Sequence, residues 1–309
     1  MKKVLVVGSL NMDMSIKIDN FPKLGETIFG YEYYESCGGK GANQAVAISK
    51  MEVKTEIIGM IGNDIQGQRL IDNLENNKVK SDNIIVNKNS HTGRAIITVD
   101  KNGNNNIIVI PGSNLEISVK DINLKEEVIL KNDIIVLQNE IPIEVINYVL
   151  EKSKELNKIT IYNPAPAKEI DDSVIKKIDY LLLNETEMEE IFKISVSDKN
   201  YKDKILELKK EKGLKNIILT LGENGSVSFN ENNKVKEYKA YKVKALDTTA
   251  AGDSFLGGFI SKLCEKVDLD EMIKYATAVS AITVTRKGAQ DSIPNKEEVE
   301  KFLFENHNM

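Results

Sequence analysis

KVLVVGS, from Lys3 to Ser9, is a valine-rich apolar run that ends in glycine and serine. Such a run is typical of a strand that is buried on both faces of a sheet. Similar runs recur at 55–62, 133–138, 159–163, 179–184 and 216–222. Segments with helical periodicity lie between most of them, at 41–51, 66–77, 144–155 and 202–212. Strands that alternate with helices predict an α/β fold with a doubly wound, mostly parallel sheet flanked by helices.

Two segments, 12–35 and 92–110, depart from this pattern because apolar and polar residues alternate in them. RAIITVD (94–100) and NNNIIVI (104–110) are joined through KNGN (101–104), which predicts a hairpin with a glycine-containing turn. We expect one α/β domain over residues 1–309, with a small antiparallel sheet formed by about 12–36 and 92–111 inserted in it. The pattern is compatible with two roles for this sheet and favours neither. The sheet is a lid or a contact between subunits, or it is a solvent-facing addition at the edge of the fold.

The composition argues against several classes of protein. The formal net charge of -5 disfavours nucleic acid as a partner, which needs a concentrated positive face. No apolar stretch is long enough to span a membrane, so no membrane partner is expected. Cys37 and Cys264 are the only cysteines, which argues against a disulfide framework and predicts a cytoplasmic location. Because the chain has 2 histidines, a His-rich metal site is almost excluded.

DTTAAGDSF (247–255) places small residues between two aspartates, directly before a run with helical periodicity. If a helix begins here, its first N–H groups have no partner inside the helix and can bind an anion. Ala250, Ala251 and Gly252 leave room for a ligand, and the helix dipole would keep Asp253 ionised. A carboxylate beside an anion pocket suits a base that accepts a hydroxyl proton during phosphoryl transfer. The alternative is a favourable terminal charge on a tightly packed helix.

Two N-terminal motifs combine glycines with polar side chains. GGKGAN (38–43) presents Lys40 and Asn43, and Gly39 permits close approach of a ligand; it lacks the spacing of a Walker loop and can equally be a turn. GSLNMDMS (8–15) places Asn11 and Asp13 two residues apart, which puts both on one face of a strand. Such a pair binds neighbouring sugar hydroxyls, or forms local hydrogen bonds in a turn.

Three further motifs end predicted strands or helices. NETE (184–187) predicts one of two roles for Asn184 and Glu187, or both together: they hold Mg²⁺ through water, or they form the capping box of a helix. TLGENG (220–225) ends a strand with small residues that could border a nucleotide. TRKGAQDS (285–292) contains Gly288, which is either a simple helix C-cap or part of a turn whose carbonyls bind a monovalent cation.

Together these motifs resemble the ribokinase family, among the phosphofructokinase-B-type carbohydrate kinases. The resemblance extends in order over nearly the whole chain, from VGSLNMD (7–13) to VTRKGAQDSIP (284–294). Its most specific parts are GGKGANQAVA (38–47) and DTTAAGD (247–253). It implies a ribokinase-like fold with a lid, and transfer of the γ-phosphoryl group of ATP to O5 of D-ribose. It also implies Mg²⁺, an activating K⁺ ion and a homodimer formed through the lid sheet.

Residue by residue, the resemblance implies a role for each motif. Asp253 matches the catalytic base, and Ala250, Ala251 and Gly252 match the anion hole. The ribose contacts that it implies, besides Asp253, are Asn11, Asp13, Gly39, Lys40, Asn43 and Glu140. The implied ATP contacts are Asn184, Thr220, Gly222, Gly252 and Thr277, with Glu187 near Mg²⁺ through water. The implied potassium ligands are Asp247, Thr249, Thr283, Arg286, Gly288 and Ser292.

The sequence departs from the family pattern at two positions. Thr277 stands where His or Asn is frequent near the adenine, and Cys37 fits a buried structural thiol. Two alternatives remain open: a related kinase that acts on fructose, deoxyribose or a nucleoside, and a catalytically silent sugar-binding protein on the same fold. The intact base and anion-hole motif favours an enzyme. Asn11, Asp13 and GGKGANQAVA favour ribose.

Overall fold

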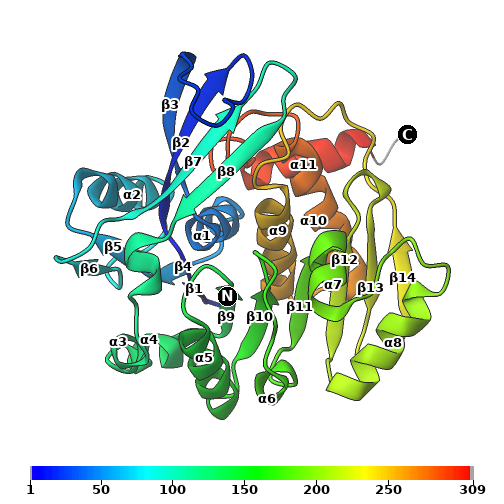
Figure 1. Cartoon of the computed structure of the whole chain (residues 1–309). Coiled ribbons are helices and arrows are strands. Elements are labelled where there is room, and N and C mark those ends of the chain that lie inside the picture. Colours follow the sequence, from blue (N-terminus) through cyan, green and yellow to red (C-terminus); the bar gives the residue numbers. More distant parts are fainter. Residues whose placement is uncertain (1, 307–309) are drawn as a thin grey trace.

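An eight-stranded sheet forms the centre of the fold (Figure 1). The computed structural model describes residues 2–306. The strand order is β14-β13-β12-β11-β10-β9-β1-β4; β12 through β4 pair in parallel, and β13 and β14 add an antiparallel edge. The predicted doubly wound, mostly parallel sheet is confirmed. The strand bounds are β1 (Val4–Val7), β4 (Thr55–Ile58), β9 (Ile134–Gln138), β10 (Ile159–Asn163), β11 (Tyr180–Asn184), β12 (Asn216–Thr220), β13 (Ser226–Phe229) and β14 (Val235–Tyr238).

Both faces of this sheet are covered, and the alternation of side chains along each strand divides the interior into two cores. In β1, Val4 and Val6 join one core with α1 (Lys40–Lys50) and α9 (Ala251–Glu265). Leu5 and Val7 join the other core with α5 (Ile143–Glu155). All four side chains are fully buried, which explains why this strand has no polar residue. The three layers place the carboxyl ends of the parallel strands at one edge, where ligands bind in such folds.

The helices begin and end within a few residues of the predicted limits wherever a helical period was visible. Asp64 caps α2 by accepting a hydrogen bond from the amide of Gly67, and Asp268 caps α10 in the same way through Glu271. The short helices α3, α4 and α6 were not predicted, because they are too short to show a period. The remaining bounds are α2 (Ile65–Asn76), α3 (Val119–Asn123), α4 (Glu126–Lys131), α6 (Asp172–Ile175), α7 (Glu185–Phe192), α8 (Tyr201–Lys212), α10 (Leu269–Thr283) and α11 (Lys296–Asn306).

The run at 55–62, predicted as one strand, is divided between two sheets. β4 lies in the central sheet, whereas β5 (Met60–Gly62) pairs with β6 (Ile85–Asn87) in a separate sheet of two strands. Gly59 lies at the division. A Cβ atom there would stand 2.3 Å from Cδ1 of Leu10 and 2.6 Å from the carbonyl oxygen of Gly8. The bend requires glycine because the chain passes directly against this backbone.

A second, four-stranded sheet stands apart from the central one (Figure 1). Its order is β3-β2-β7-β8, and β7 with β8 forms the predicted hairpin. The two outer pairs are antiparallel, while β2 and β7 at its centre pair in parallel. We call it the small sheet. Its bounds are β2 (Asn11–Ile18), β3 (Gly30–Gly38), β7 (Gly93–Val99) and β8 (Asn105–Ile110).

Within residues 2–306, no helix combines the length and the apolar character that crossing a bilayer requires.

Candidate active site

Asp253 lies in the first turn of α9 and is buried, with 6 % of its surface exposed. Both carboxylate oxygens accept hydrogen bonds from side-chain amides of α1. Oδ2 accepts from Nδ2 of Asn43 at 3.2 Å, and Oδ1 accepts from Nε2 of Gln44 at 2.9 Å. The two motifs that the sequence singled out, GGKGAN and DTTAAGD, therefore meet at this carboxylate. Gln44 was not predicted as a site residue, although it follows GGKGAN directly.

The start of α9 presents unpaired main-chain amides beside that carboxylate. The residue before the helix, Ala250, has a left-handed conformation with φ 60, and no side chain caps the helix. Among the described residues, the amides of Gly252 and Asp253 have no acceptor, whereas the amide of Ala251 donates to the carbonyl oxygen of Thr248. Apart from its chain neighbours and the nearby backbone of α9, no heavy atom of the described residues lies within 4 Å of a Cβ built on Gly252. An anion can therefore approach this helix end directly.

A cleft extends from Asp253 along the carboxyl ends of the strands. Its first part is a cavity of about 190 Å³, which brings together most of the residues predicted to lie near the phosphates: Lys40, Asn184, Glu187, Thr220, Ala250, Ala251, Gly252 and Asp253. Its second part is a cavity of about 460 Å³ that shares Thr220, Ala251 and Gly252 with the first and also reaches Gly222 and Thr277. Volume and shape suit an elongated ligand whose anionic end meets α9.

The wall of the larger cavity contains residues that sequence reasoning missed. They are mostly apolar and come from the segment after β14, from α10 and from the residue that follows α10, and they include Tyr241, Val243, Ala245, Ala281 and Val284. The segment 240–245 has neither helical nor strand periodicity, so nothing in its sequence indicates a binding wall. Thr277 lies in the wall, but its hydroxyl donates to the carbonyl oxygen of Ile273 at 2.7 Å. That donor is therefore occupied by the helix backbone.

Lys40 lines the first cavity together with Asp253, and its main chain contacts Glu140. Lys40 is the first residue of α1, and its main-chain N–H donates to Oε2 of Glu140 at 3.0 Å. Burial opposes the charge of the Lys40 side chain, but the carboxylates of Asp253, Glu140 and Glu187 outweigh that effect and raise its pKa. Gly39 precedes it with φ 88, and a Cβ there would stand 2.6 Å from the amide nitrogen of Asn11. Glycine at this position lets α1 begin against β2.

Asn11 and Asp13 lie in β2 on one face of the small sheet, as their spacing predicted. Asp13 stands opposite Ser36 of β3 and Ala95 of β7. The side-chain oxygen of Asn11 accepts a hydrogen bond of 2.7 Å from Asn114, a buried residue that the sequence did not single out. Asn114 also bonds both main-chain groups of Leu10, at 2.9 and 3.0 Å. It thereby fixes the point where the chain leaves the central sheet for the small sheet.

The carboxyl of Asp13 is protonated more easily in the folded protein than in the unfolded chain. Burial, followed by the neighbouring charges of Glu140 and Asp253, raises its pKa from 3.8 to about 7. At pH values between these two pKa values, the folded state therefore keeps a proton that the unfolded state has lost. The free energy of unfolding falls as the pH rises through this window.

We expect Asp13→Asn to remove this loss of stability with rising pH, because an amide does not titrate. The free energy of unfolding of the variant, relative to the wild type, should increase from pH 5 to pH 8. Urea unfolding at the two pH values measures that difference. A difference that stays constant would contradict the expected titration.

Asn184 and Glu187 form the capping box of α7, so one of the two predicted roles is present. Asn184 accepts from the amide of Glu187 at 2.8 Å, and Glu187 accepts from the amide of Asn184 at 3.0 Å. Burial is the main cause that raises the pKa of Glu187. Within residues 2–306, no three carboxylate, histidine or cysteine side chains cluster as metal ligands. A magnesium ion therefore fits here only if phosphates and water supply most of its ligands, as is usual for Mg²⁺.

The residues predicted to bind potassium come from the loop before α9 and from the end of α10 with the loop that follows it, and hydrogen bonds join these two segments. The amides of Leu246 and Asp247 both donate to the carbonyl oxygen of Val284, at 2.7 and 3.2 Å. Asp247 accepts from Thr249 and from the amide of Gly288, each at 2.9 Å. Burial opposes its ionisation, but these hydrogen bonds keep its pKa below the usual range. A carboxylate among turn carbonyls suits a weakly hydrated monovalent cation.

The other predicted potassium ligands differ in what they can offer. Thr283 and Ser292 are buried, and the hydroxyl of Ser292 donates to the carbonyl oxygen of Ala289 at 2.7 Å, which leaves its lone pairs for a cation. The guanidinium of Arg286 is positively charged and pairs with Glu298 at 2.6 Å, so it cannot bind a cation. Arg286 can therefore contribute its carbonyl oxygen alone.

The fold has three layers, and a cleft runs along the carboxyl ends of its parallel strands. At one end of this cleft lie the Asp253 carboxylate and the free amides of α9. This arrangement is typical of a small-molecule phosphotransferase. The comparisons with known proteins identify its family. The family model described as pfkB family carbohydrate kinase matches residues 1–296. The chain belongs to this family.

Two curated relatives and two solved structures illustrate the position of the chain within the family. The chain is 36 % identical over 302 residues to a ribokinase of Haemophilus influenzae, covering 98 % of both chains. It is 34 % identical over 301 residues to a deoxyribokinase of Salmonella typhi, covering 97 % of this chain and 98 % of that one. The crystal structure of a Thermotoga maritima ribokinase matches with TM-score 0.89 and 41 % identity, over 98 % of this chain and 100 % of the other. The structure of an Arabidopsis thaliana ribokinase, complexed with ribose and ATP, matches with TM-score 0.91 and 29 % identity over 98 % of each.

Proposed function

We propose that the protein transfers the γ-phosphoryl group of ATP to O5 of D-ribose, with Asp253 as general base and the amides at the start of α9 as anion hole. The observation that carries the proposal is the buried Asp253 carboxylate beside the unpaired amides of Gly252 and Asp253. The ribokinases among the relatives, one of them solved with ribose and ATP, support the choice of substrates. The nucleotide would occupy the cleft, with its phosphates at Gly252 and its base near Thr277.

Ribose would lie between the central sheet and the small sheet, held by Asn11, Asp13 and Asn43. Asp253 would orient the 5-hydroxyl toward the γ-phosphorus. It would accept the hydroxyl proton as the bond from O5 to the γ-phosphorus forms and the bond from the γ-phosphorus to the leaving ADP breaks. A carboxylate is a weak base toward an alcohol, but it suffices because the proton moves late in a loose transition state. Closure of the small sheet over the sugar would exclude water, which would otherwise compete with the sugar as acceptor.

Negative charge on the transferring group would be stabilised by the amides of Gly252 and Asp253 and by the ammonium group of Lys40. Glu187 would hold Mg²⁺ through water; bound to the phosphates, the ion supplies charge neutralisation. The potassium site would be formed by Asp247 and the carbonyl of Thr249, with the carbonyls of Thr283, Arg286 and Gly288 and the hydroxyl of Ser292. Bound there, a cation would stabilise the loop before α9 from the side away from the substrate.

The acceptor is tested by an assay of ADP formation with ATP and a panel of sugars: D-ribose, 2-deoxy-D-ribose, D-fructose and a nucleoside. We expect D-ribose to give the highest kcat/KM. Activity confined to another member of the panel would refute the choice of ribose, and a deoxyribokinase among the relatives makes 2-deoxy-D-ribose the sharpest comparison. No turnover with any sugar would favour a silent sugar-binding protein.

Replacing potassium by sodium in that assay should lower kcat with ribose. The expected physical reason is that the smaller ion fits carbonyl ligands at the Asp247 loop less well, so the start of α9 is held less firmly. The measurement is kcat in the two chloride salts at equal ionic strength. Equal rates would remove the cation from the proposal but would leave the base and the anion hole untouched.

The small sheet would also join two subunits. Tyr33 and Ile108 lie on its face opposite Asp13 and are 58 % and 62 % exposed. A sheet face with large exposed apolar side chains is typical of an interface. Sedimentation of the protein at several concentrations tests this part, because a monomer at all of them would refute it.

A further inference from the structure

The side chains that touch Asp253 are themselves held by a second set of buried amides. Asn43, Gln44, Gln138 and Gln290 are each less than a tenth exposed. A carboxylate accepts hydrogen bonds and cannot donate them. Asn43 and Gln44 therefore stabilise Asp253 only while each points its NH₂ group, and not its oxygen, toward the carboxylate.

The two ends of a carboxamide have almost the same shape, so packing alone does not decide which end faces Asp253. The hydrogen-bond partner at the other end decides it. For Asn43 that partner is Gln290, whose Nε2 donates to Oδ1 of Asn43 at 3.0 Å. Because its oxygen is occupied in this way, Asn43 turns its NH₂ group toward Asp253.

The orientation of Gln290 is fixed in turn by α2. Nδ2 of Asn73 donates to Oε1 of Gln290 at 2.5 Å. Nδ2 of Asn77 donates to the side-chain oxygen Oδ1 of Asn73 at 3.4 Å, and to the main-chain carbonyl oxygen of the same residue at 2.8 Å. The donors therefore point one way along the series, from Asn77 through Asn73 and Gln290 to Asn43 and the carboxylate.

A second series reaches the other oxygen of Asp253 from the central sheet. Nε2 of Gln138, the last residue of β9, donates to Oε1 of Gln44 at 2.6 Å. Gln44 donates to Asp253 and to Oδ1 of Asn163, at 2.9 and 3.0 Å. Asn163 uses its own NH₂ group on the carbonyl oxygen of Leu182 at 3.0 Å, so its oxygen faces Gln44.

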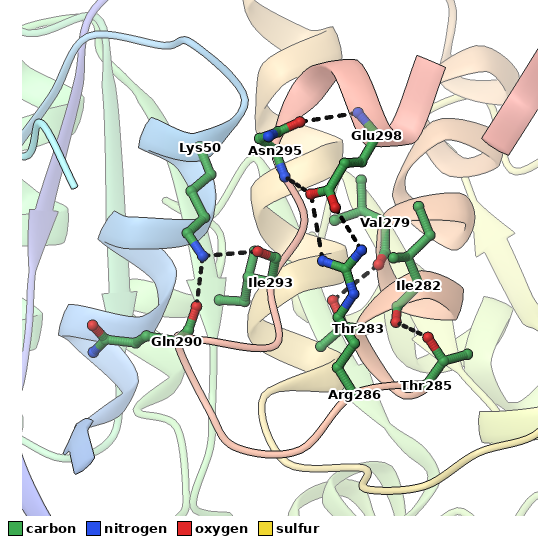
Figure 2. A network of polar contacts seen from close by, with 10 residues as sticks. All are labelled: Lys50, Val279, Ile282, Thr283, Thr285, Arg286, Gln290, Ile293, Asn295 and Glu298. Atoms are coloured by element: carbon green, nitrogen blue, oxygen red, sulfur yellow. Dashed lines mark hydrogen bonds and ion pairs between the residues drawn. The ribbon is translucent and has the colours of Figure 1, made fainter. Parts of the chain in front are cut away.

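Gln290 belongs to the loop between α10 and α11, residues 284–295, and the main chain of this loop is anchored at both sides. Figure 2 shows Lys50 reaching from α1 to the loop, where Nζ donates to the carbonyl oxygens of Gln290 and Ile293 at 2.7 and 2.8 Å. On the far side, Arg286 pairs with Glu298 of α11 (Figure 2). These contacts hold the Gln290 backbone where its side chain meets Asn43.

We propose that Gln290 and Gln138, which do not contact Asp253, are positioning residues that set the donor direction of Asn43 and Gln44 and thereby hold the base in the orientation needed for proton transfer. This inference rests on the proposed role of Asp253. The inference has a specific consequence. The ability of residue 290 to donate a hydrogen bond to Asn43 matters more for turnover than the size of its side chain.

The test compares Gln290→Glu with Gln290→Met. Glutamate keeps the shape of glutamine but presents only acceptors to Asn43, which must then turn its oxygen toward Asp253. We expect kcat to fall by about 10- to 100-fold, the usual range for a group that orients a functional side chain. Methionine leaves Asn43 without a partner, and we expect a smaller fall of about three- to tenfold. The KM for ATP should stay within about twofold in both variants, since neither change touches the cleft.

The matched control is Gln68→Glu on the exposed surface of α2, which makes the same change away from the site and should keep the wild-type kcat. Thermal unfolding of each variant separates lost turnover from lost fold. Wild-type kcat in Gln290→Met, or equal losses in Gln290→Met and Gln290→Glu, would overturn the inference. If instead Asp253→Asn keeps normal turnover, the role of Asp253 fails first, whatever the Gln290 variants do.

Discussion

Asp253→Asn is expected to lower kcat by about 10³-fold while the affinity for ribose stays largely intact. The variant keeps the shape of the side chain and its place in the first turn of α9. It loses the ability to take the hydroxyl proton. Because the proton moves in the transition state, the loss should fall on kcat and not on ground-state binding. Steady-state kinetics, together with calorimetric titration of ribose, measures the two effects separately.

Thermal unfolding provides the control for this variant. Asn43 and Gln44 both donate to the carboxylate, and an asparagine offers only one acceptor to them. A small loss of stability is therefore expected, of about 1–3 kcal/mol for one buried donor left without a partner. Near-normal turnover would exclude Asp253 as the base.

Gly252→Val is expected to lower kcat/KM for ATP by about 10²- to 10³-fold, because its side chain would occupy the space in front of the free amides. The fold should tolerate the change. Among the described residues, a Cβ at Gly252 meets no heavy atom within 4 Å apart from its chain neighbours and the nearby backbone of α9, and residue 252 lies in an ordinary helical turn. Enzyme kinetics and thermal unfolding should therefore give opposite results: a large loss of activity with little change in the unfolding temperature.

Two further variants make this test sharper. Gly252→Ala should give a smaller loss of activity, because a methyl group fills less of the space. Gly258→Ala, in the same helix, should instead lower stability, since a Cβ there would stand 2.7 Å from Cγ2 of Val279. Wild-type kinetics in Gly252→Val would contradict the binding of phosphate at this helix end.

The strands and long helices were predictable because the spacing of apolar residues along the sequence indicates which of their side chains are buried. β1, β9 and β12 are apolar runs covered on both faces, and α9 begins where small residues precede an apolar period. The break at Gly59 was not predictable, because its cause is the backbone of Gly8, which lies far away in the sequence. The parallel pairing of β2 with β7 is likewise a non-local contact.

The candidate site was partly predictable for the same reason. Asp253, Lys40 and Glu187 stand in short motifs at strand or helix ends, where the chemistry of the residues is visible locally. Asn114 and Gln138 lie outside the quoted motifs, and Gln290 lies in TRKGAQDS without any local sign of its role. The role of a buried amide depends on the groups that it faces in the folded protein. The apolar cavity wall after β14 was also not predictable from the sequence, because an irregular segment shows no periodicity of apolar residues.

The layered α/β fold, and a carboxylate beside bare amides at one helix start, can be predicted from the amino-acid sequence alone, because they depend on residues close together along the chain whose propensities act locally. The direction in which the donors of Asn43 and Gln44 point, and the way in which Lys50 and Asn73 hold Gln290 at the site, become visible only in the folded chain. Hydrogen-bond direction in a buried amide is set by partners that folding brings from distant parts of the chain.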